Sequence, residues 1–194
     1  TDADGDSFSL DFTGKITVNV ENDLPTIGFN EKLATGGVQE DALGNELADD
    51  AADDIDSSTG NIDSADDSDS VTLNLSELLD TTPGADEPAS VDYSIKGLET
   101  PVKSDYTSNG QEVWYYEEGG KLVARSGDGG NAAGTVVFTF AVDASTGVAT
   151  FNLDDQLDHF GNEDDDELLA IDDLGSYVEA KITDADDDTI SLDF

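Results

Sequence analysis

An acidic eleven-residue segment occurs twice in this chain, and the distance between the two copies sets the size of the folding unit. Residues 2–12 read DADGDSFSLDF, and residues 184–194 read DADDDTISLDF, a constant offset of 182 positions without a gap. Agreement at most positions is more than chance allows, even in an Asp-rich sequence. Long periods of this kind are typical of modules in a tandem array. The sequence therefore predicts one repeat unit with an acidic joint at each end.

The charge of the chain restricts its partners. There are 47 acidic residues against seven Lys and Arg, a formal net charge of −40. No basic face is available to neutralise phosphates, so nucleic acid is not an expected partner. Anionic membrane surfaces are disfavoured for the same reason, and no apolar run is long enough for direct membrane insertion.

The kind of acid points to cations. The acidic residues are 34 Asp and 13 Glu, and Asp is favoured in turns and in oxygen-rich calcium loops. The chain has no Cys, which leaves metal as the obvious cross-link for a secreted domain without disulfides. We therefore expect Ca²⁺ to relieve the self-repulsion of the folded chain. A halophilic surface coat is the alternative explanation of the same composition.

Alternation of apolar and polar residues, typical of half-buried strands, recurs along the sequence. A helical turn capped by Ser76 is expected directly after the alternating segment 71–75. Many short strands separated by turn residues predict an all-β fold: a calcium-bound β-sandwich of about nine or ten strands, with long acidic loops and at most short helices. The alternating segments are residues 7–20, 71–75, 91–95, 112–117 with 121–125, 135–142 with 148–153, and 177–182.

The repeat suggests how the chain is divided. Residues 1–24 are interpreted as a joint with the first strand, and residues 25–194 as the sandwich module that ends in the next joint. A single domain over 1–194 is the alternative.

Carboxylates at alternate positions in the two joints indicate a hard cation held by oxygen ligands. The spacing resembles the start of an EF-hand loop, but the Gly and Glu that such a loop needs further on are missing. We expect instead an acidic turn that shares calcium with the acids after the first strand; a turn without metal is the alternative. The predicted ligands are Asp2, Asp4, Asp6, Glu21, Asp23, Asp184, Asp186 and Asp188.

Two further acidic stretches are candidates for calcium loops. Residues 158–167 offer oxygens close enough in sequence to wrap one ion, and the lone His159 beside them is interpreted as structural, because zinc takes several His or Cys ligands. Residues 39–70 are acidic and poor in large apolar side chains, which is typical of a loop ordered by a cation or of a plain linker. The predicted ligands of the first stretch are Asp158, Asn162, Asp164 and Asp166.

Catalysis is not predicted, whereas the aromatic residues suggest a binding surface. No phosphate loop and no nucleophile-plus-base motif occurs, and paired carboxylates carry no information in so acidic a chain. Trp114, Tyr115 and Tyr116 stand together, and alternation places Tyr115 on the opposite face of its strand from the other two. One face is expected in the core, and the exposed members are candidate ligand contacts.

Taken in order, the motifs of the chain resemble the repeat domains of large RTX adhesins. They are the two acidic joints, ENDLP at 21–25, GKLVAR at 120–125 before VFTF at 137–140, DASTG at 143–147 and Leu-Asp-His at 157–159. The resemblance implies calcium-rigidified sandwiches in series, exported by type I secretion and held on the bacterial cell surface. Adjacent repeat modules of the same chain are then partners.

The resemblance also implies the function. We expect a non-enzymatic, calcium-dependent, extracellular module that binds a peptide or protein on a host or neighbouring cell, in adhesion or biofilm formation. The long acidic insertion favours recognition, because extra loops are often functional. A structural extender rigidified by calcium is the first alternative, and a glycan-binding module is the second.

Overall fold

The computed structural model describes residues 4, 23–40, 43, 69–129, 133–159 and 169–194. Over these residues the chain is all-β, with strands joined by short turns and two 3-10 helices, and no helix is long and apolar enough to cross a membrane. The elements are β1 (Thr26–Phe29), β2 (Ser70–Asn74), η2 (Leu75–Leu78), β3 (Leu79–Thr82), β4 (Ser90–Ile95), β5 (Val102–Ser108), β6 (Gln111–Glu118), β7 (Lys121–Ser126), β8 (Thr135–Val142), β9 (Val148–Leu153), η3 (Leu174–Tyr177), β10 (Val178–Thr183) and β11 (Thr189–Asp193).

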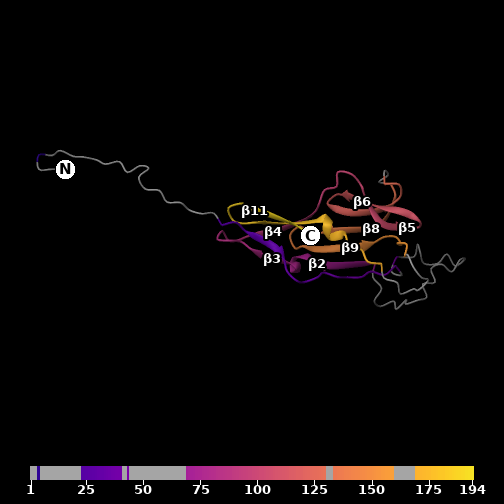
Figure 1. Ribbon diagram of the computed structural model, residues 1–194, viewed down its shortest axis with the longest axis horizontal. Helices are drawn as coiled ribbons and strands as arrows, with labels where there is room; N and C mark the ends of the chain where they lie inside the picture. Colours follow the sequence, from indigo (N-terminus) through magenta and orange to yellow (C-terminus); the bar gives the residue numbers. More distant parts are fainter. Residues whose placement is uncertain (1–3, 5–22, 41–42, 44–68, 130–132, 160–168) are drawn as a thin grey trace.

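The strands form three antiparallel sheets in a sandwich-like arrangement, which confirms the predicted fold class. The largest sheet has six strands in the order β2-β9-β8-β7-β6-β5, the second has the order β11-β10-β4, and β1 pairs with β3. The body is elongated, with β3, β4 and β11 gathered towards one end and β5 and β6 towards the other (Figure 1). Chain neighbours pair in β6-β7-β8-β9, so most of the large sheet is a meander of hairpins.

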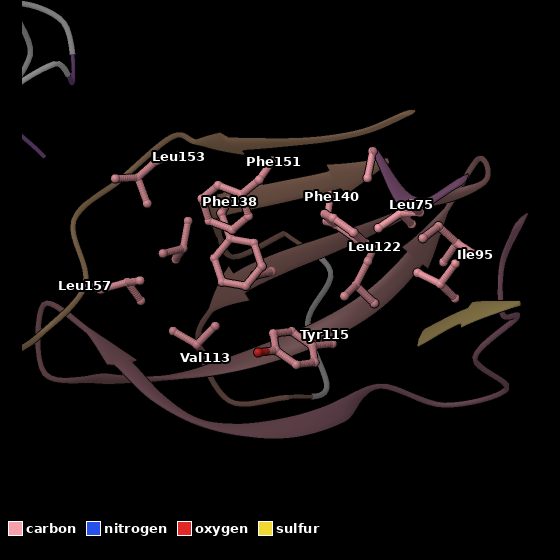
Figure 2. Packing of buried hydrophobic residues seen from close by; sticks show 14 of the residues in the cluster. Leu75, Ile95, Val113, Tyr115, Leu122, Phe138, Phe140, Phe151, Leu153 and Leu157 are labelled. Carbon is pink, nitrogen blue, oxygen red and sulfur yellow. The ribbon is translucent and has the colours of Figure 1, made fainter. Parts of the chain in front are cut away.

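The core lies between the six-stranded and three-stranded sheets, because each contributes the buried half of an alternating strand. Val113 and Tyr115 from β6 are fully buried, as is Phe138 from β8. Val178 and Ala180 from β10 belong to the same cluster. Figure 2 shows the labelled side chains of this cluster pointing into one interior, where the rings of Phe138 and Phe151 lie 5.0 Å apart.

The turn between β8 and β9 is fixed by one carboxylate. Asp143 Oδ1 accepts hydrogen bonds from the backbone N–H groups and hydroxyls of Ser145 and Thr146, at 2.8–3.1 Å. These four donors favour the ionised form and lower the pKa of Asp143 to about 2. The turn ends at Gly147, whose φ of +68° suits glycine.

Replacing Gly147 by Ala should destabilise the protein more than the same change at Gly110. Both glycines have positive φ, at +68° and +72°. A Cβ at Gly147 would meet the Tyr93 ring at 2.7 Å, whereas a Cβ at Gly110 would meet nothing within 4 Å. We expect about 1–2 kcal/mol of backbone strain at both sites and a further 1–3 kcal/mol from overpacking at Gly147 alone. Urea unfolding of the two variants measures the difference, and equal losses would contradict the packing argument.

Several predicted elements are confirmed at their positions. The strands predicted at 71–75, 91–95 and 177–182 are β2, β4 and β10, and both predicted hairpins are present as β6-β7 and β8-β9. The strand predicted at 7–20 and most of the acidic segment 39–70 lie outside the described residues.

The structure also corrects and extends the predictions. The Ser76 cap is wrong: the 3-10 helix η2 begins at Leu75, Asn74 occupies the N-cap position, and the Ser76 hydroxyl donates to Asn74 Oδ1 at 2.7 Å. Strands β1, β3, β5 and β11 lie outside the predicted alternating segments, and they bring the number in the described part to eleven.

Candidate metal centre

Three segments far apart in sequence meet at one end of the molecule. They are the chain entering β1, the connection from β3 to β4, and the turn from β10 to β11 (Figure 1). The first two are joined by the register of β1 and β3, which pairs Thr26 with Thr82. The last two are joined by a hydrogen bond from the Ala185 N–H to the Asp86 carbonyl, at 3.2 Å.

Three carboxylates converge at this junction. Asp86 comes from the β3–β4 connection, and Asp184 and Asp186 come from the β10–β11 turn. One oxygen of each lies within 4.8 Å of the corresponding oxygen of the other two. Like charges this close repel one another unless a proton or a cation separates them.

Asp184 is the buried member of the cluster. Its side chain and backbone together are 5 % exposed. Its Oδ1 accepts a hydrogen bond from the Asp188 N–H at 2.8 Å, while its Oδ2 is buried without a hydrogen-bond partner. A buried carboxylate oxygen without a donor costs free energy that the native state rarely tolerates. Within the described residues no donor serves this oxygen, so either a proton or a bound cation would remove that cost.

Repulsion between the carboxylates also changes the acidity of the cluster. The pKa of Asp186 is raised, first because a proton on this group can be shared with the Asp184 carboxylate, then by desolvation, and then by repulsion from Asp184, Asp188 and Asp86. Two ionised carboxylates cannot donate to each other, so a proton is one way to satisfy the buried oxygen. A bound cation is the other, and it also neutralises the remaining charges.

The backbone holds this turn in shape. The Asp184 N–H donates to the Asp188 carbonyl at 3.1 Å, and the Asp187 N–H donates to the Asp184 carbonyl at 3.3 Å. Asp187 has φ of +72°, the left-handed conformation in which Asp is tolerated and Gly is favoured. The side chains of Asp184 and Asp186 are thus presented by a closed turn at the end of a strand pair.

The donor set fits a hard cation. Carboxylate oxygens are the ligands that Ca²⁺ prefers, in a flexible shell of six to eight oxygens. Within the described residues the group contains no His or Cys, and these are the ligands that structural zinc sites require. Three carboxylates leave coordination positions for water or for oxygens of further groups, so the junction suits Ca²⁺ better than Zn²⁺.

The structure brings together two of the predicted ligands and adds one. Asp184 and Asp186 lie in the cluster, and the backbone of Asp188 closes its turn. Asp86 was not predicted as a ligand, because no pattern of alternate carboxylates surrounds it. The Pro-Gly pair that precedes it indicates a turn and says nothing about a metal. Contact across the fold assigns it to the site.

The other predicted joint ligands have different positions. Asp23 is exposed and lies beside Gly84, where a Cβ would come within 3.3 Å of Asp23 Oδ2. It flanks the cluster without being one of the three convergent groups. Asp4 is exposed. Asp2, Asp6 and Glu21 lie outside the described residues.

The second predicted calcium stretch is described only at its start. Asp158 Oδ2 accepts from the Gly110 N–H at 2.9 Å, and the Asp158 N–H donates to the Thr107 carbonyl at 2.8 Å, so this residue ties its segment to the β5–β6 hairpin. His159 Nε2 lies 3.6 Å from Glu40 Oε1. Asn162, Asp164 and Asp166 lie outside the described residues.

The predicted aromatic contacts are largely internal. Tyr115 is fully buried, and Tyr116 is 9 % exposed on the opposite face of β6. Trp114 is half-buried, and Gly129 lies so close to its ring that a Cβ would come within 2.3 Å of it. A shallow depression of about 200 Å³ beside β2, lined by Leu33, Thr72 and Glu77 among others, is smaller than the roughly 300–1,000 Å³ of small-molecule sites.

Comparisons with known proteins give a family for this chain. No curated protein and no solved structure matched it. A family described as a domain of unknown function, DUF5801, matches residues 46–194, the part that holds Asp86, Asp184 and Asp186. The chain therefore belongs to the DUF5801 family of domains.

Proposed function

We propose that this chain is a non-enzymatic, calcium-binding structural module of a bacterial RTX-type surface adhesin. In this function a Ca²⁺ ion ties the β10–β11 turn to the β3–β4 connection, at the end where the chain enters the sandwich. The observation that carries the proposal is the buried Asp184 carboxylate: its Oδ2 has no hydrogen-bond partner, and the group converges with two further carboxylates. The order of motifs shared with RTX adhesins supports the setting.

An extracellular setting suits a site of this kind. Extracellular calcium modules bind with dissociation constants of about 10⁻⁴–10⁻³ M, so they fill only where calcium is abundant. Self-repulsion in a chain with a net charge of −40 would destabilise the folded state until calcium binds. Export would then supply the ion that completes the fold, and neighbouring modules of the same chain would be its partners.

A ligand-binding module has less support. Two of the three aromatic candidates are buried, and Tyr115 is part of the core between the sheets. Of the three, only the half-buried Trp114 is left with surface to offer a peptide or a glycan. The structural module is accordingly the function we put forward.

Isothermal titration of the metal-free chain tests the proposal. We expect Ca²⁺ to bind and Mg²⁺ to bind more weakly, because Mg²⁺ demands a rigid octahedron and gives up water reluctantly. Asp86→Asn should remove the strongest class of sites, since it takes one charge from the cluster. Asp92→Asn, an equal change of charge at an exposed position on β4, is the matched control. Unchanged calcium binding by Asp86→Asn would overturn the assignment of this site.

A further inference from the structure

Strands β5 and β6 are joined by a two-residue turn made of Asn109 and Gly110. Ser108 pairs with Gln111, so only these two residues lie between the strands. Both have positive φ, +50° at Asn109 and +72° at Gly110. Positive φ at both positions is the requirement of a type I′ turn, and it is the reason why Asn-Gly is the favoured pair there. Both residues are exposed, so water reaches the turn.

The same pair of residues is chemically labile. Glycine has no side chain to obstruct its own backbone nitrogen. After losing its proton to a base in the solvent, the Gly110 nitrogen can attack Asn109 Cγ; a new C–N bond forms, and the side-chain nitrogen leaves as ammonia. Water then opens the resulting succinimide at either carbonyl, which gives aspartate or isoaspartate. Of the asparagines in the sequence, only Asn109 is followed by glycine.

Both reacting groups are held by the segment 154–158, which follows β9. Asp158 Oδ2 accepts a hydrogen bond from the Gly110 N–H at 2.9 Å. Gln156 Nε2 donates a hydrogen bond to Asn109 Oδ1, also at 2.9 Å. The nucleophilic nitrogen and the side chain that it would attack are therefore each bound by a different residue of one neighbouring segment.

The segment 154–158 is itself fixed by the fold. Leu157 is buried in the core cluster, and its N–H donates to Glu40 Oε1 at 2.6 Å. The Asp158 N–H donates to the Thr107 carbonyl of β5 at 2.8 Å. The positions of the two side chains that hold the turn thus depend on tertiary contacts, and these are lost when the module unfolds.

The two contacts oppose the reaction at both of its atoms. Loss of the Gly110 amide proton would place an anion beside the Asp158 carboxylate, and a neighbouring like charge disfavours ionisation. The hydrogen bond from Gln156 fixes the Asn109 side chain, whose Cγ has to rotate towards the Gly110 nitrogen before the attack. The turn therefore has to open locally before it can react.

We propose that Asn109 is a modification site, at which the chain deamidates to aspartate or isoaspartate, and that Gln156 and Asp158 keep it unreacted while the module is folded. Isoaspartate would lengthen the backbone of a two-residue turn. Either product would add a negative charge beside Asp158 in a chain whose net charge is already −40. This inference does not rest on the calcium site.

Incubation of the full chain in chelator at mildly alkaline pH, followed by peptide mapping, measures the reaction at Asn109. The folded parent should deamidate more than about tenfold more slowly than the parent unfolded in guanidinium, where both contacts are lost. Asp158→Ala should raise the rate in the folded chain by about tenfold, the change expected from loss of one hydrogen bond to a charged group. Gln156→Ala should also raise it.

Asp105→Ala is the matched control. It removes the same charge from an exposed position on β5, in the same hairpin, and leaves the two contacts to the turn in place. This variant should deamidate at the parent rate. In guanidinium all variants should react at one rate, because the Asn-Gly pair is unchanged.

Amide hydrogen exchange separates a lost contact from a lost fold. Within the part of the chain that the structure describes, the Gly110 N–H has Asp158 as its acceptor, so it should be protected in the parent and exchange freely in Asp158→Ala. The N–H groups of β6 should stay protected in both, which shows that the variant is folded. If Asp158→Ala does not fold, the same comparison of deamidation rates in Gln156→Ala decides the proposal.

Three results would overturn the proposal. The first is an equal deamidation rate in the folded and the unfolded parent. The second is a parent rate in the folded Asp158→Ala chain or, where that chain does not fold, in Gln156→Ala. The third is an equal rise in Asp105→Ala, which would assign the effect to net charge and not to the contacts at the turn.

Discussion

In millimolar calcium the chain should melt well above its melting temperature in chelator, and Asp184→Asn should remove the part of this difference that its site supplies. One site filled at a hundred times its dissociation constant adds about 2.7 kcal/mol to the free energy of unfolding. For a chain of this length that is a shift of about 5–10 °C, and further sites would add to it. The Asp184 carboxylate is the buried member of the cluster, so its replacement removes one of the three convergent charges at the position that water screens least.

The same variant should behave in the opposite way without calcium. In chelator, Asp184→Asn should be at least as stable as the parent. An amide keeps one oxygen for the Asp188 N–H, replaces the unpartnered oxygen by an N–H donor, and removes one charge from the cluster with Asp86 and Asp186. Asp184→Asn is therefore expected to be less stable than the parent in calcium and at least as stable in chelator.

A matched control separates ligation from charge. Asp187→Asn removes the same charge from the same turn, but Asp187 is not one of the convergent groups, and Asn tolerates its positive φ. This variant should keep the calcium shift. A calcium shift retained in full by Asp184→Asn, or lost equally in Asp187→Asn, would contradict the site. An equal rise of the melting temperature in sodium chloride alone would favour the halophilic explanation of the composition.

Tyr115→Ala should lower the free energy of unfolding by about 3–5 kcal/mol, the cost of removing a large buried aromatic side chain. The Tyr115 ring is fully buried and makes edge-on contacts with Phe138 at 5.8 Å and with Tyr177 at 5.3 Å. Its hydroxyl donates to Asp173 Oδ1 at 3.1 Å. Urea unfolding followed by Trp114 fluorescence measures the loss.

Tyr115→Phe isolates the hydroxyl from the ring. Burial raises the pKa of Asp173, and the hydrogen bond from Tyr115 lowers it. Losing that donor should cost about 1–3 kcal/mol, because the half-buried carboxylate is left short of a partner. Tyr106→Phe is the control, since the Tyr106 hydroxyl donates to the exposed Ala170 carbonyl at 3.1 Å. A stable Tyr115→Ala chain would show that this residue is not part of the core and would revive its interpretation as a ligand contact.

The hairpins of the large sheet could be predicted because their signals are local. In β8-β9, apolar alternation on each side of Asp143-Ala144-Ser145-Thr146-Gly147 fixes both the strands and the turn. Strand β5 could not be found in this way, because its two buried side chains, Ser104 and Ser108, are polar. Ser104 is buried there and its hydroxyl donates to the Val113 carbonyl at 2.8 Å, a contact that only the folded sheet supplies.

The metal centre was half predictable for a similar reason. The alternate carboxylates of the β10–β11 turn are adjacent in sequence, so Asp184 and Asp186 could be selected by their spacing. Asp86 joins them only through the pairing of β4 with β10, which brings its connection beside that turn. The burial of Asp184 could not be predicted either, because the spacing of carboxylates in the sequence does not show which of them is removed from solvent.

The position of β11 has a mechanical consequence. β11 runs from the acidic turn, at the end where the chain enters, back along the body towards Phe194 (Figure 1). Tension applied between Pro25 and Phe194 would thus act along the strand. The ladder bonds to β10 are perpendicular to the strand direction, so the five register pairs would share the load in shear. A module pulled in this geometry resists until the whole strand slides, whereas a hairpin pulled from its open end gives way one pair at a time.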